Sequence, residues 1–363
     1  MQKKRILCLI DSLGLGGAQR QMIGLVDLLR KKGYMADLAI YHKRIFYQHL
    51  LDELQIPVIT LAHGGSRWSK LNAVRKLIRK NHYDVVITYM TGANVIGALL
   101  KWSGMSFKLI VSDRTTNMKR SRRDDLIYAI CRKADFVVPN SFSQAEFLSK
   151  NYPYLASRIH TITNFTDPQF SPIAPQPEHP QLRLLGAGRL SREKNILTLI
   201  QAIRLLKDRD IQVQLTWYGD TCRMAGSDEY RQDLETAIHT LGVQNQVRIC
   251  PAIPHLIEAY HACDAFCLPS FSEGFPNTVC EAMSCGKPIL CSNVCDNPRI
   301  VEEGINGFLF TPESATMIAD TIQKFWHLPY EQRLQMGVKS RELSLQRFST
   351  ERFVEQYITL IEN

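Results

Sequence analysis

The chain lacks several features that would assign it to a particular class of protein. No apolar run reaches the roughly 18 residues needed to span a bilayer, so we expect no membrane-spanning helix. The apolar stretch at residues 6–10 ends at Asp11 and is too short for a secretion signal, which favours a first β-strand. None of the ten cysteines forms a CxxC pair, and most lie in apolar runs. This distribution favours buried, reduced thiols in a cytoplasmic protein over disulfides or a zinc site, and we expect no bound metal.

The composition that remains is that of a soluble globular protein, with 45% apolar and 22% charged residues. A chain of 363 residues is too long for one compact core, so we expect two domains. Charge is divided unevenly between the two halves. Residues 1–165 hold 26 Lys and Arg against 11 Asp and Glu, a net +15, whereas residues 166–363 hold 18 against 24, a net −6. This asymmetry points to an anionic partner for the first half only.

Short β-branched runs alternate with helical patterns along the first half. The expected strands are residues 5–10, 36–41, 58–61, 85–89, 108–112, 136–139 and 159–163. Residues 18–32 have the period of an amphipathic helix. Such alternation predicts a parallel sheet that is covered by helices.

The alternation stops at a Pro-rich stretch and then restarts. Residues 171–180 contain four prolines and no apolar period, which indicates a linker. Beyond it, the expected strands are residues 183–187, 213–218, 247–250, 265–268 and 288–292, and the expected helices are 195–207, 230–241, 277–285 and 350–362. The sequence therefore predicts an α/β protein with two doubly wound, Rossmann-like domains facing each other across a cleft.

The predicted boundaries follow from this alternation. We assign residues 1–168 to the first domain, 169–181 to the linker and 182–345 to the second domain. Residues 346–363 form a C-terminal segment whose helix we expect to pack back on the first domain.

The most informative segment is 271–286, where two acids, Glu273 and Glu281, lie on either side of a Gly-Phe-Pro-Asn turn. An apolar run at 265–270 precedes it, so strand, turn and helix follow in order. The helix N-terminus beside the turn supplies free N–H groups and a positive dipole end. Along an uninterrupted helix axis the acids would lie about 12 Å apart. This arrangement suits a ligand with hydroxyls at both ends and phosphates between, such as a sugar nucleotide.

Glycines follow the first expected strand of the chain. Gly14, Gly16 and Gly17 would let the backbone approach a ligand and open a helix whose N–H groups can bind an anion. The spacing is not GxGxxG, and no acid follows at the distance that a dinucleotide site needs, which argues against a dehydrogenase. A tight strand-to-helix turn without a ligand is the alternative.

The first expected strand of the second half is followed by Gly-Ala-Gly-Arg-Leu-Ser-Arg-Glu-Lys-Asn, residues 186–195. Its cations, Arg189, Arg192 and Lys194, would lie at the C-terminal end of the strand. Cations at this place can neutralise a diphosphate, and Arg can do so bidentately. The alternative is a solvated basic turn.

With these elements in this order, the chain resembles glycosyltransferase family 4, the retaining sugar-nucleotide transferases of the two-domain B-type (GT-B) fold. The resemblance covers nearly the whole chain. Its motifs are the acid pair inside EGFPNTVCEAMSCGKP, the basic segment GAGRLSREKN and the N-terminal SLGLGGAQ. Residues 138–141 and 162–164 are similar to the domain-closing segments of the family. Among relatives the chain is most similar to bacterial enzymes that extend lipid-linked oligosaccharides or surface polysaccharides, including lipopolysaccharide.

The resemblance implies that residues 1–168 form an acceptor-binding domain and residues 182–345 a nucleotide-sugar-binding domain. It also implies a role for each matched position. Glu281 would hold the ribose hydroxyls, Glu273 would face the donor sugar and the reacting centre, and the turn between them would fix the sugar. Arg189 and Lys194 would bind the diphosphate, which the N-terminal glycines would approach from the other domain. The implied catalytic residues are Glu273, Arg189 and Lys194. The implied donor-binding residues are Gly16, Gly17, Arg189, Lys194, Glu273, Gly274, Phe275, Pro276, Asn277 and Glu281.

The reaction implied is the transfer of a sugar, N-acetylhexosamine or hexose, from a UDP-sugar to an acceptor hydroxyl with retention of configuration. Arg189, Lys194 and helix N-termini would stabilise the charge that grows on the departing phosphate in place of a metal ion, so no cofactor is expected. UDP is adopted because it is the commonest leaving group of the family. The sequence leaves open whether Glu273 acts as a nucleophile or only as an electrostatic stabiliser.

The sequence departs from the family pattern on both sides of the expected site. The usual glycine after Lys194 is Asn195, which we expect to alter the turn. Many relatives carry a His near the end of the strand at 85–89, and this chain has none there. We therefore place the acceptor side at the later strand end and the loop after it, at Asp113, Arg114, Lys119 and Arg120.

Two basic segments of the first half are candidates for contact with a membrane. Residues 68–80 place apolar side chains three to four positions apart, with cations on the other sides. This helix either lies on anionic lipid or packs its apolar face on the sheet. Residues 119–123 either face a polyprenyl diphosphate or form a solvated loop. We expect a lipid-linked glycan acceptor and an enzyme that is cytoplasmic and peripheral on the inner face of the cytoplasmic membrane.

Two other functions fit parts of the sequence. One is a sugar-nucleotide epimerase or a phosphorylase on the same fold, and the other is a basic nucleic-acid-binding module. The basic stretches lack interleaved aromatic residues and no nucleic-acid-binding motif is present, so we expect no nucleic-acid partner.

Overall fold

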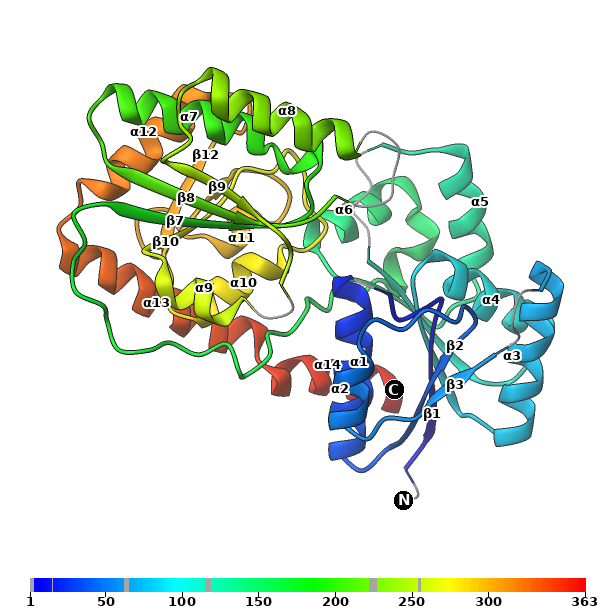
Figure 1. Ribbon diagram of the computed structural model, residues 1–363. Coiled ribbons are helices and arrows are strands. Elements are labelled where there is room, and N and C mark those ends of the chain that lie inside the picture. Colours follow the sequence, from blue (N-terminus) through cyan, green and yellow to red (C-terminus); the bar gives the residue numbers. More distant parts are fainter. Residues whose placement is uncertain (1–2, 15, 62–64, 115–118, 222–226, 254–255) are drawn as a thin grey trace. The chain divides into compact units, whose positions relative to one another are not determined.

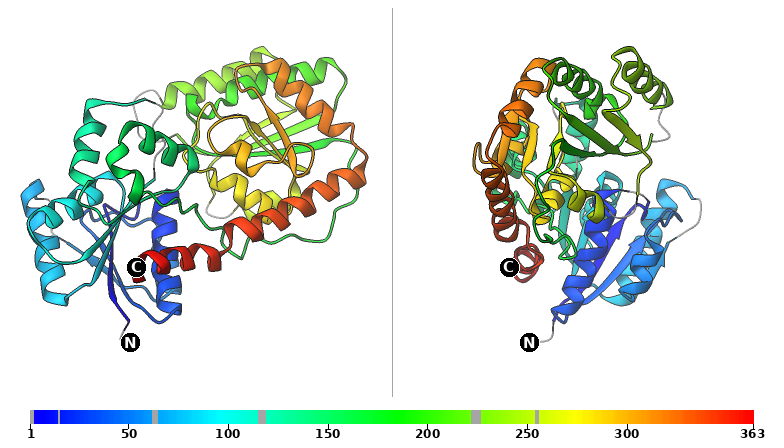
Figure 2. Two further views of the ribbon diagram at one scale, coloured as in Figure 1. Left: turned by 180° about the vertical axis from the view of Figure 1, so that it is seen from behind. Right: turned by 60° about the vertical axis from the view of Figure 1, so that its left-hand side comes forward.

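The computed structural model describes residues 3–14, 16–61, 65–114, 119–221, 227–253 and 256–363. The chain divides into two compact units. Unit 1 consists of Met1–Phe165 and Thr350–Asn363, and unit 2 consists of Thr166–Ser349. Each unit is built on a six-stranded parallel sheet with helices packed on both faces (Figures 1 and 2). The α/β, doubly wound architecture predicted from the sequence is confirmed.

Unit 1 contains the sheet β3-β2-β1-β4-β5-β6. Its strands are β1 (Arg5–Ile10), β2 (Met35–Ile40), β3 (Val58–Thr60), β4 (Val85–Tyr89), β5 (Lys108–Asp113) and β6 (Phe136–Pro139). Its helices are α1 (Gly17–Lys31), α2 (Gln48–Glu53), α3 (Arg67–Asn81), α4 (Thr91–Trp102), α5 (Arg122–Cys131), α6 (Phe142–Asn151), the 3-10 turn η1 (Pro153–Arg158) and α14 (Thr350–Glu362).

Both faces of this sheet are buried, which explains why its strands are continuous apolar runs rather than alternating ones. Ile6 and Cys8 of β1 belong to the core beneath α1 and α14, whereas Leu7 and Leu9 belong to the core on the opposite face. The helices begin where a polar side chain can cap them. The hydroxyls of Ser66, Ser121 and Ser141 accept from backbone N–H groups of α3, α5 and α6.

The last helix, α14, belongs to unit 1 although the chain before it forms unit 2. Phe353, Tyr357 and Ile361 are part of the unit 1 core, and α14 packs against α1. Lys4 Nζ donates to the carbonyl of Ile361 at 2.6 Å, and a cation at a helix C-terminus is favourable.

Unit 2 repeats the arrangement with the sheet β12-β11-β10-β7-β8-β9. Its strands are β7 (Leu182–Ala187), β8 (Val213–Tyr218), β9 (Val247–Cys250), β10 (Ala265–Leu268), β11 (Ile289–Ser292) and β12 (Gly307–Phe310). Its helices are η2 (Arg192–Lys194), α7 (Ile196–Asp208), α8 (Ser227–Thr240), α9 (Ile257–Ala262), α10 (Asn277–Ser284), α11 (Asn297–Ile300), α12 (Ala315–Trp326) and α13 (Tyr330–Phe348).

Some details of the predicted elements are wrong. Residues 159–163 form no strand, because only Ile159 makes a single bridge, to Val137. The short strand β12, with the sequence Gly-Phe-Leu-Phe, was not predicted, because it begins with glycine, which is depleted in strands, and has no β-branched side chain. The unit boundary lies between Phe165 and Thr166, and Phe170, within the stretch assigned to the linker, is buried in the unit 2 core.

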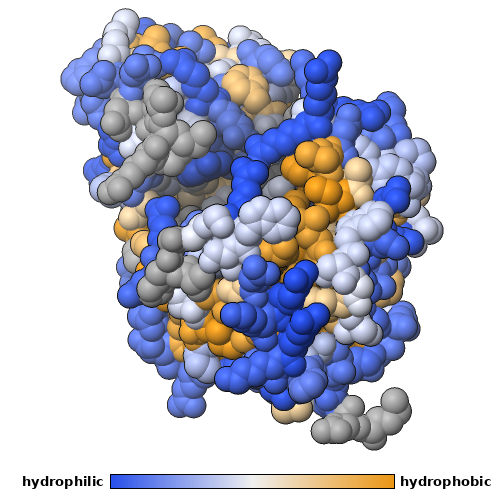
Figure 3. Space-filling view, turned by 90° about the vertical axis from the view of Figure 1, so that its right-hand side faces the viewer, coloured by the Kyte–Doolittle hydropathy of each residue, from blue (hydrophilic) through white to orange (hydrophobic). Residues whose placement is uncertain are grey.

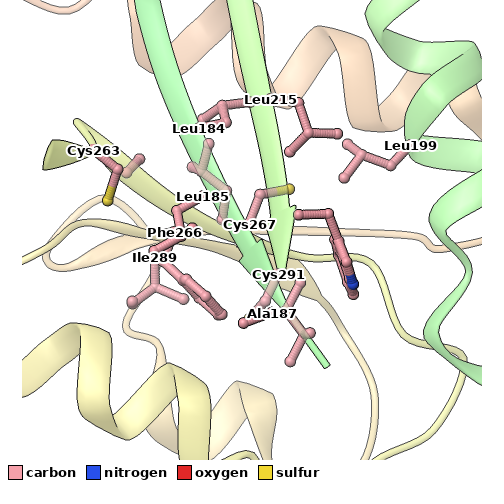
Figure 4. Close-up of a cluster of buried hydrophobic side chains, with 14 of the residues drawn as sticks. Leu184, Leu185, Ala187, Leu199, Leu215, Cys263, Phe266, Cys267, Ile289 and Cys291 are labelled. Atoms are coloured by element: carbon pink, nitrogen blue, oxygen red, sulfur yellow. The ribbon is translucent and has the colours of Figure 1, made fainter. Parts of the chain in front are cut away.

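Cysteines fill the unit 2 core in place of larger aliphatic side chains. Cys263, Cys267 and Cys291 lie among leucine and isoleucine side chains on and around β7, β8 and β10 (Figure 4). The described cysteines are free thiols, and burial raises the pKa of Cys263 to about 12. Cys222 lies outside the described residues. The prediction of buried thiols is therefore confirmed for the cysteines at these core positions.

Within the described part of the chain, no helix is long and apolar enough to cross a membrane.

Candidate functional site

The strand order identifies where each unit can bind a ligand. In both sheets the first strand of the unit lies between the second and the fourth, so the direction of winding reverses between β1 and β4 and between β7 and β10. In such sheets, ligands bind outside the carboxyl ends of the strands at this switch point. The segments that follow β7 and β10 are therefore the candidate site of unit 2.

These two segments carry the acid and the lysine that the sequence singled out. Lys194 Nζ lies 2.6 Å from Oε1 of Glu273, and the two side chains are 14% and 7% exposed. Ser270 Oγ donates to the same carboxylate oxygen at 2.5 Å. Because both contacts fall on Oε1, the other carboxylate oxygen keeps its capacity to accept from a ligand. Ser270 was not recognised in the sequence, although its place at the end of a strand was a signal.

The loop that presents Lys194 is fastened to the end of β10. The Phe271 N–H donates to the carbonyl of Glu193 at 2.9 Å, and Ser272 Oγ donates to the Glu193 carboxylate at 3.1 Å. These contacts cross between segments almost eighty positions apart, and they hold the lysine and Glu273 in one place.

Asn195 strengthens this connection. Its side-chain Nδ2 donates to the carbonyls of Pro269 at 3.0 Å and Pro312 at 2.7 Å, and its Oδ1 accepts from Thr198 Oγ1 at 2.6 Å. Its backbone has φ 55° and ψ 35°, the left-handed conformation that glycine adopts readily and asparagine tolerates. The expectation that Asn195 alters the turn is therefore wrong in this respect, because its backbone takes a conformation open to glycine and its amide adds anchors.

Glycines bring β7 and β8 close together beside this loop. A Cβ on Gly219 would lie 1.9 Å from the carbonyl oxygen of Gly188, which no side chain can tolerate. The same carbonyl accepts from Trp217 Nε1 at 3.0 Å. The sequence analysis missed Gly219, although a glycine directly after a strand often marks a close backbone approach. Arg189, one residue after Gly188, is exposed.

The second acid, Glu281, lies in the second turn of α10 and is 4% exposed. Tyr260 OH donates to its Oε2 at 3.0 Å and also lies 3.1 Å from the carbonyl of Thr278. Tyr260, on α9, is fully buried and was not recognised as a site residue.

In the turn between the acids, Phe275 is 8% exposed and its ring contacts Phe348 at a centroid distance of 5.7 Å.

In unit 1 the glycine loop follows β1, one of the two switch-point strands. Gly16 caps α1 and Gly17 is its first residue, as expected for a loop that opens a helix. The Gly16 N–H donates to Tyr47 OH at 3.3 Å, and Tyr47 OH donates to the Gly16 carbonyl at 3.1 Å. Leu15 lies outside the described residues.

The end of β4, the other switch-point strand, has an unusual backbone. Met90 has φ 73° and ψ 150°, a region populated almost only by glycine. Strain of this kind clusters at functional sites, and here it lies at the start of α4. The residue type carries no signal of this conformation, so it was not predicted.

Asp113 and Arg114, predicted for the acceptor side, are nearly buried and engaged within unit 1. Tyr128 OH donates to Asp113 Oδ2 at 2.5 Å. Arg114 donates to Asn164 and, at 3.0 Å, to Tyr357 OH of α14. These contacts join the end of β5 to the last residues before unit 2 and to the helix after it.

Lys119 and Arg120, the other acceptor-side residues, are exposed, and Arg120 pairs with Asp125 at 2.6 Å. They belong to a surface that we name the basic rim. It consists of exposed cations that follow the carboxyl ends of β2, β3 and β5, namely Lys43, Arg44, Arg67, Lys119, Arg120, Arg122 and Arg123.

Large apolar side chains are exposed among these cations. Trp68, at the start of α3, is 73% exposed, and Leu126, in α5, is 64% exposed. Figure 3 looks onto the side that carries α3, α4 and α5 in Figure 1, where apolar side chains gather among hydrophilic ones. Mixed cationic and apolar surface of this kind suits the interface of an anionic membrane.

The apolar face of α3 does not contribute to this surface. Leu71, Val74 and Ile78 are buried in the unit 1 core. Of the two alternatives left open for this helix, the structure supports the second, in which the apolar face packs on the sheet. The exposed side chains of α3 include Trp68 and the cations Arg67, Lys76, Arg79 and Lys80.

Two sequence models match the chain, one to each half. A model described as Glycosyltransferase Family 4 matches residues 15–170, and a model described as Glycosyl transferases group 1 matches residues 172–343. Together they cover most of each unit.

Curated relatives and a solved structure agree with these models. Two Campylobacter jejuni enzymes are each 24% identical. One is an α-1,4-N-acetyl-D-galactosaminyltransferase whose name includes GalNAc-GalNAc-diNAcBac-PP-undecaprenol. The match covers 77% of this chain and 76% of that enzyme. The other is an N-acetylgalactosamine-N,N'-diacetylbacillosaminyl-diphospho-undecaprenol 4-α-N-acetylgalactosaminyltransferase, over 81% of each chain. HepE of Anabaena, crystallised with UDP and glucose, has a TM-score of 0.85 at 22% identity over 99% of this chain and 100% of its own. The fold is GT-B.

Proposed function

This chain belongs to the family 4 glycosyltransferases, and we propose that it transfers a sugar from a UDP-sugar to a hydroxyl of a lipid-linked glycan with retention of configuration. The observation that carries the proposal is the Lys194–Glu273 pair, which is held at the switch point of unit 2 by contacts between the two segments. The acid can accept from sugar hydroxyls, and the lysine beside it can bind a diphosphate.

The donor is proposed to lie along the ends of β7 and β10. Glu281 accepts from the ribose hydroxyls while Tyr260 holds its Oε2. Glu273 faces the sugar, the backbone of residues 274–277 fixes it, and Lys194 and the exposed Arg189 bind the diphosphate. In unit 1, Gly16 and Gly17 open α1, whose N-terminal N–H groups can bind an anion. UDP as the nucleotide is supported by the HepE complex, which contains UDP.

The chemistry proposed needs one bond to break and one to form. The bond between the sugar C1 and the β-phosphate oxygen breaks, and a new bond forms from C1 to the acceptor oxygen on the same face. The acceptor proton passes to the departing phosphate. Lys194, Arg189 and helix N–H groups stabilise the negative charge on that phosphate, a role that a divalent ion has in other transferases. A lysine fixed beforehand by Glu273 costs little reorganisation at the moment of reaction.

The acceptor is proposed to be a polyprenyl diphosphate-linked glycan at the inner face of the cytoplasmic membrane. The names of both Campylobacter relatives include an undecaprenol-linked diphosphate glycan. In this chain the basic rim, together with Trp68 and Leu126, would contact the anionic membrane. The acceptor-side residues on the rim, Lys119 and Arg120, would face the acceptor diphosphate, with Asp113 and Arg114 behind them.

Transfer can be tested with a panel of UDP-hexoses and UDP-N-acetylhexosamines and an undecaprenyl diphosphate glycan. We expect one donor to stabilise the protein against heat and to release UDP only when acceptor is present, with an α-linked product from an α-linked donor. Conversion of the donor to an isomer without acceptor would contradict the proposal and favour an epimerase. Failure of every UDP-sugar alongside success with another nucleotide would contradict the choice of UDP alone.

Membrane contact is tested separately by flotation with vesicles of neutral or anionic lipid. Binding to anionic vesicles should weaken as salt rises, because the contact is electrostatic. The variant Arg122→Ser/Arg123→Ser should float less than the unaltered protein. A matched control, Arg204→Ser/Arg209→Ser, removes two cations of unit 2 and should float as well as the unaltered protein.

A further inference from the structure

Unit 2 contains a cavity of about 320 Å³ away from the candidate donor site. It lies where the strands begin, because it is lined by Arg183 of β7, by Asp264 before β10 and by Pro288 before β11. Lys194 and Glu273 follow the opposite ends of β7 and β10. A strand of six residues spans about 20 Å, so the two sites are separate.

The roof of the cavity is the Pro-rich stretch, which we name the strap (residues 171–180). Residues 172–176 of the strap line the cavity, and its side chains from 172 onward are exposed. The strap is held by contacts at several points. Tyr330 OH donates to the carbonyl of Gln176, Arg333 pairs with Glu178, and the carbonyl of Ser171 lies 2.7 Å from His261 Nε2. These contacts keep a roof over the space instead of letting it collapse.

The wall opposite the strap is apolar and comes from α12 and α13. It includes Phe325, Trp326, Leu334 and Val338. Val338 is 48% exposed, and Ile173 of the strap, which also lines the cavity, is 45% exposed. Burying such half-exposed aliphatic side chains against a ligand is favourable by about 25 cal/mol per Å².

Four cations line the same cavity, namely Arg183, Lys287, Arg333 and Arg341. Its two acids are Asp264 and Glu342, and Glu342 pairs with Lys339 at 2.7 Å. Arg183 pairs with Asp264 and Arg333 with Glu178 of the strap. Lys287 and Arg341 differ from these, because in the described part of the chain neither pairs with a carboxylate. Their partners are backbone carbonyls.

Some of these carbonyls lie at the C-terminal ends of the helices α9 and α10. Lys287 Nζ donates to the carbonyls of His261 at 3.2 Å and Cys263 at 2.9 Å, at the end of α9. Arg341 Nη1 donates to those of Phe170 at 2.9 Å and Ser284 at 2.8 Å, the latter at the end of α10. A helix C-terminus carries about half a negative charge, so each cation keeps an excess of positive charge. The two hydrogen bonds of Arg341 use Nη1 alone, which leaves its other guanidinium nitrogens to donate.

We propose that the strap cavity binds a small anionic amphiphile. Its carboxylate or phosphate monoester is held by Lys287 and Arg341, and its short apolar chain lies between Ile173 and Val338. The volume is near the lower end of the roughly 300–1,000 Å³ of small-molecule sites, which suits one short chain and excludes a two-chain lipid. Charge complementarity and the apolar wall together define this ligand class. The site is independent of the proposed glycosyl transfer.

Binding can be measured on the full chain with decanoate and decyl phosphate as probes, by calorimetry and by Trp fluorescence, below the concentration at which micelles form. Both anions should bind saturably and raise Tm. Decanol, which has the same chain and no charge, should bind at least tenfold more weakly. Equal binding of decanol, or no saturable binding of either anion, would overturn the proposal.

Variants locate the binding. Val338→Trp should fill the cavity from its half-exposed rim and abolish decanoate binding, whereas Val338→Ala should retain it. Lys287→Met should weaken binding at least tenfold. Its matched control is Lys207→Met, since Lys207 also donates to a backbone carbonyl, that of Gly242, but lies outside the cavity. Unchanged affinity in folded Val338→Trp, judged by circular dichroism, would show that the probe binds elsewhere and would overturn the assignment.

Discussion

The two units have the same strand order but opposite charge. Numbered within its own unit, each sheet reads 3-2-1-4-5-6. Unit 1 has 27 basic and 14 acidic side chains, a net +13, and unit 2 has 17 and 21, a net −4. Since the topology is shared, it cannot account for the difference in charge. A parallel sheet supplies the place of a site, and the loops after its strands supply the chemistry.

The loops of the two units are also held differently. In unit 2 the segments after the switch-point strands are joined by the Lys194–Glu273 pair, by Glu193 and by the Asn195 amide. In unit 1 the cations of the basic rim are exposed at the surface. This contrast agrees with the proposal that unit 2 positions a small donor and that unit 1 attracts a large anionic partner.

The largest effect should come from breaking the pair in unit 2. Lys194→Ala should lower kcat/KM for the donor by about 30- to 1,000-fold, because losing one preorganised donor to an oxyanion costs about 2–4 kcal/mol. Initial rates at varied donor concentration check this. The matched control is Arg192→Ala, in the same turn, whose exposed side chain pairs with Asp233. It should change the rate less than threefold.

Two outcomes would contradict the role of Lys194. One is unchanged donor turnover in Lys194→Ala. The other is an equal loss in Arg192→Ala, which would mean that the turn matters but the lysine charge does not.

A smaller loss is expected from releasing the anchor of that turn. Asn195→Gly keeps the left-handed backbone but removes the bonds to Pro269 and Pro312, whose buried carbonyls then lack their partner. The free energy of unfolding should fall by about 2 kcal/mol, since an unsatisfied buried group costs about 1–3 kcal/mol. Urea unfolding measures this. Asn195→Ala should lower the free energy of unfolding more than Asn195→Gly does, because alanine adds strain at positive φ. The reverse order would show that the backbone conformation is unimportant.

Sequence reasoning recovered the parts of this comparison that depend on chain order alone. Apolar runs identified β4, β6, β8, β9 and β10 to the residue. Parallel-sheet logic placed Lys194 and Glu273 after the carboxyl ends of their strands, and the structure shows that these strands are neighbours and that the two side chains meet.

Other features depend on how side chains meet in three dimensions. Tyr260 reaches Glu281 from a different helix, and no local pattern reveals that contact. The apolar stripe of α3 has the same period whether it faces lipid or a sheet, so only the packing of Leu71, Val74 and Ile78 decides between them. The four-residue β12 lacks any β-branched side chain and is recognised only by its pairing with β11.

The units should also differ in alkaline solution. Burial raises the pKa of Cys263 and Cys285 in unit 2 to about 12, and it raises the pKa of Cys267, Cys280 and Cys291 as well. In the described part of unit 1, Cys8 and Cys131 are shifted similarly. A thiol whose pKa is raised on folding stays protonated in the native state. Above the ordinary value of 9.0, the unfolded chain loses that proton, and stability falls as pH rises toward 12.

Unit 2, with more such thiols, should therefore be the more sensitive unit. The slope of the unfolding free energy between pH 9 and 10.5 measures this. Removing one titrating thiol with Cys291→Ala should make the slope less steep by up to about 1.4 kcal/mol per pH unit. An unchanged slope would mean that Cys291 is not protonated and buried as described. The slope, and not the stability at neutral pH, is the readout, because the substitution also leaves a small cavity.

The smallest effect concerns strain at the two switch points. Unit 2 places a glycine and an asparagine at its positive-φ positions after β7, Gly188 and Asn195, and both residue types tolerate such backbones. Unit 1 places Met90 at φ 73° and ψ 150°, where a side chain costs about 1–3 kcal/mol. Met90→Gly should relieve this strain. Glycine also gives the unfolded chain more freedom, which lowers the free energy of unfolding by about 0.5–1 kcal/mol. The net result should be a gain of about 1 kcal/mol in urea unfolding. Met90→Ala keeps a Cβ and should therefore give no gain in the free energy of unfolding. If alanine stabilised the protein as much as glycine, the switch point of unit 1 would hold no backbone strain. The two units would then not differ in this respect.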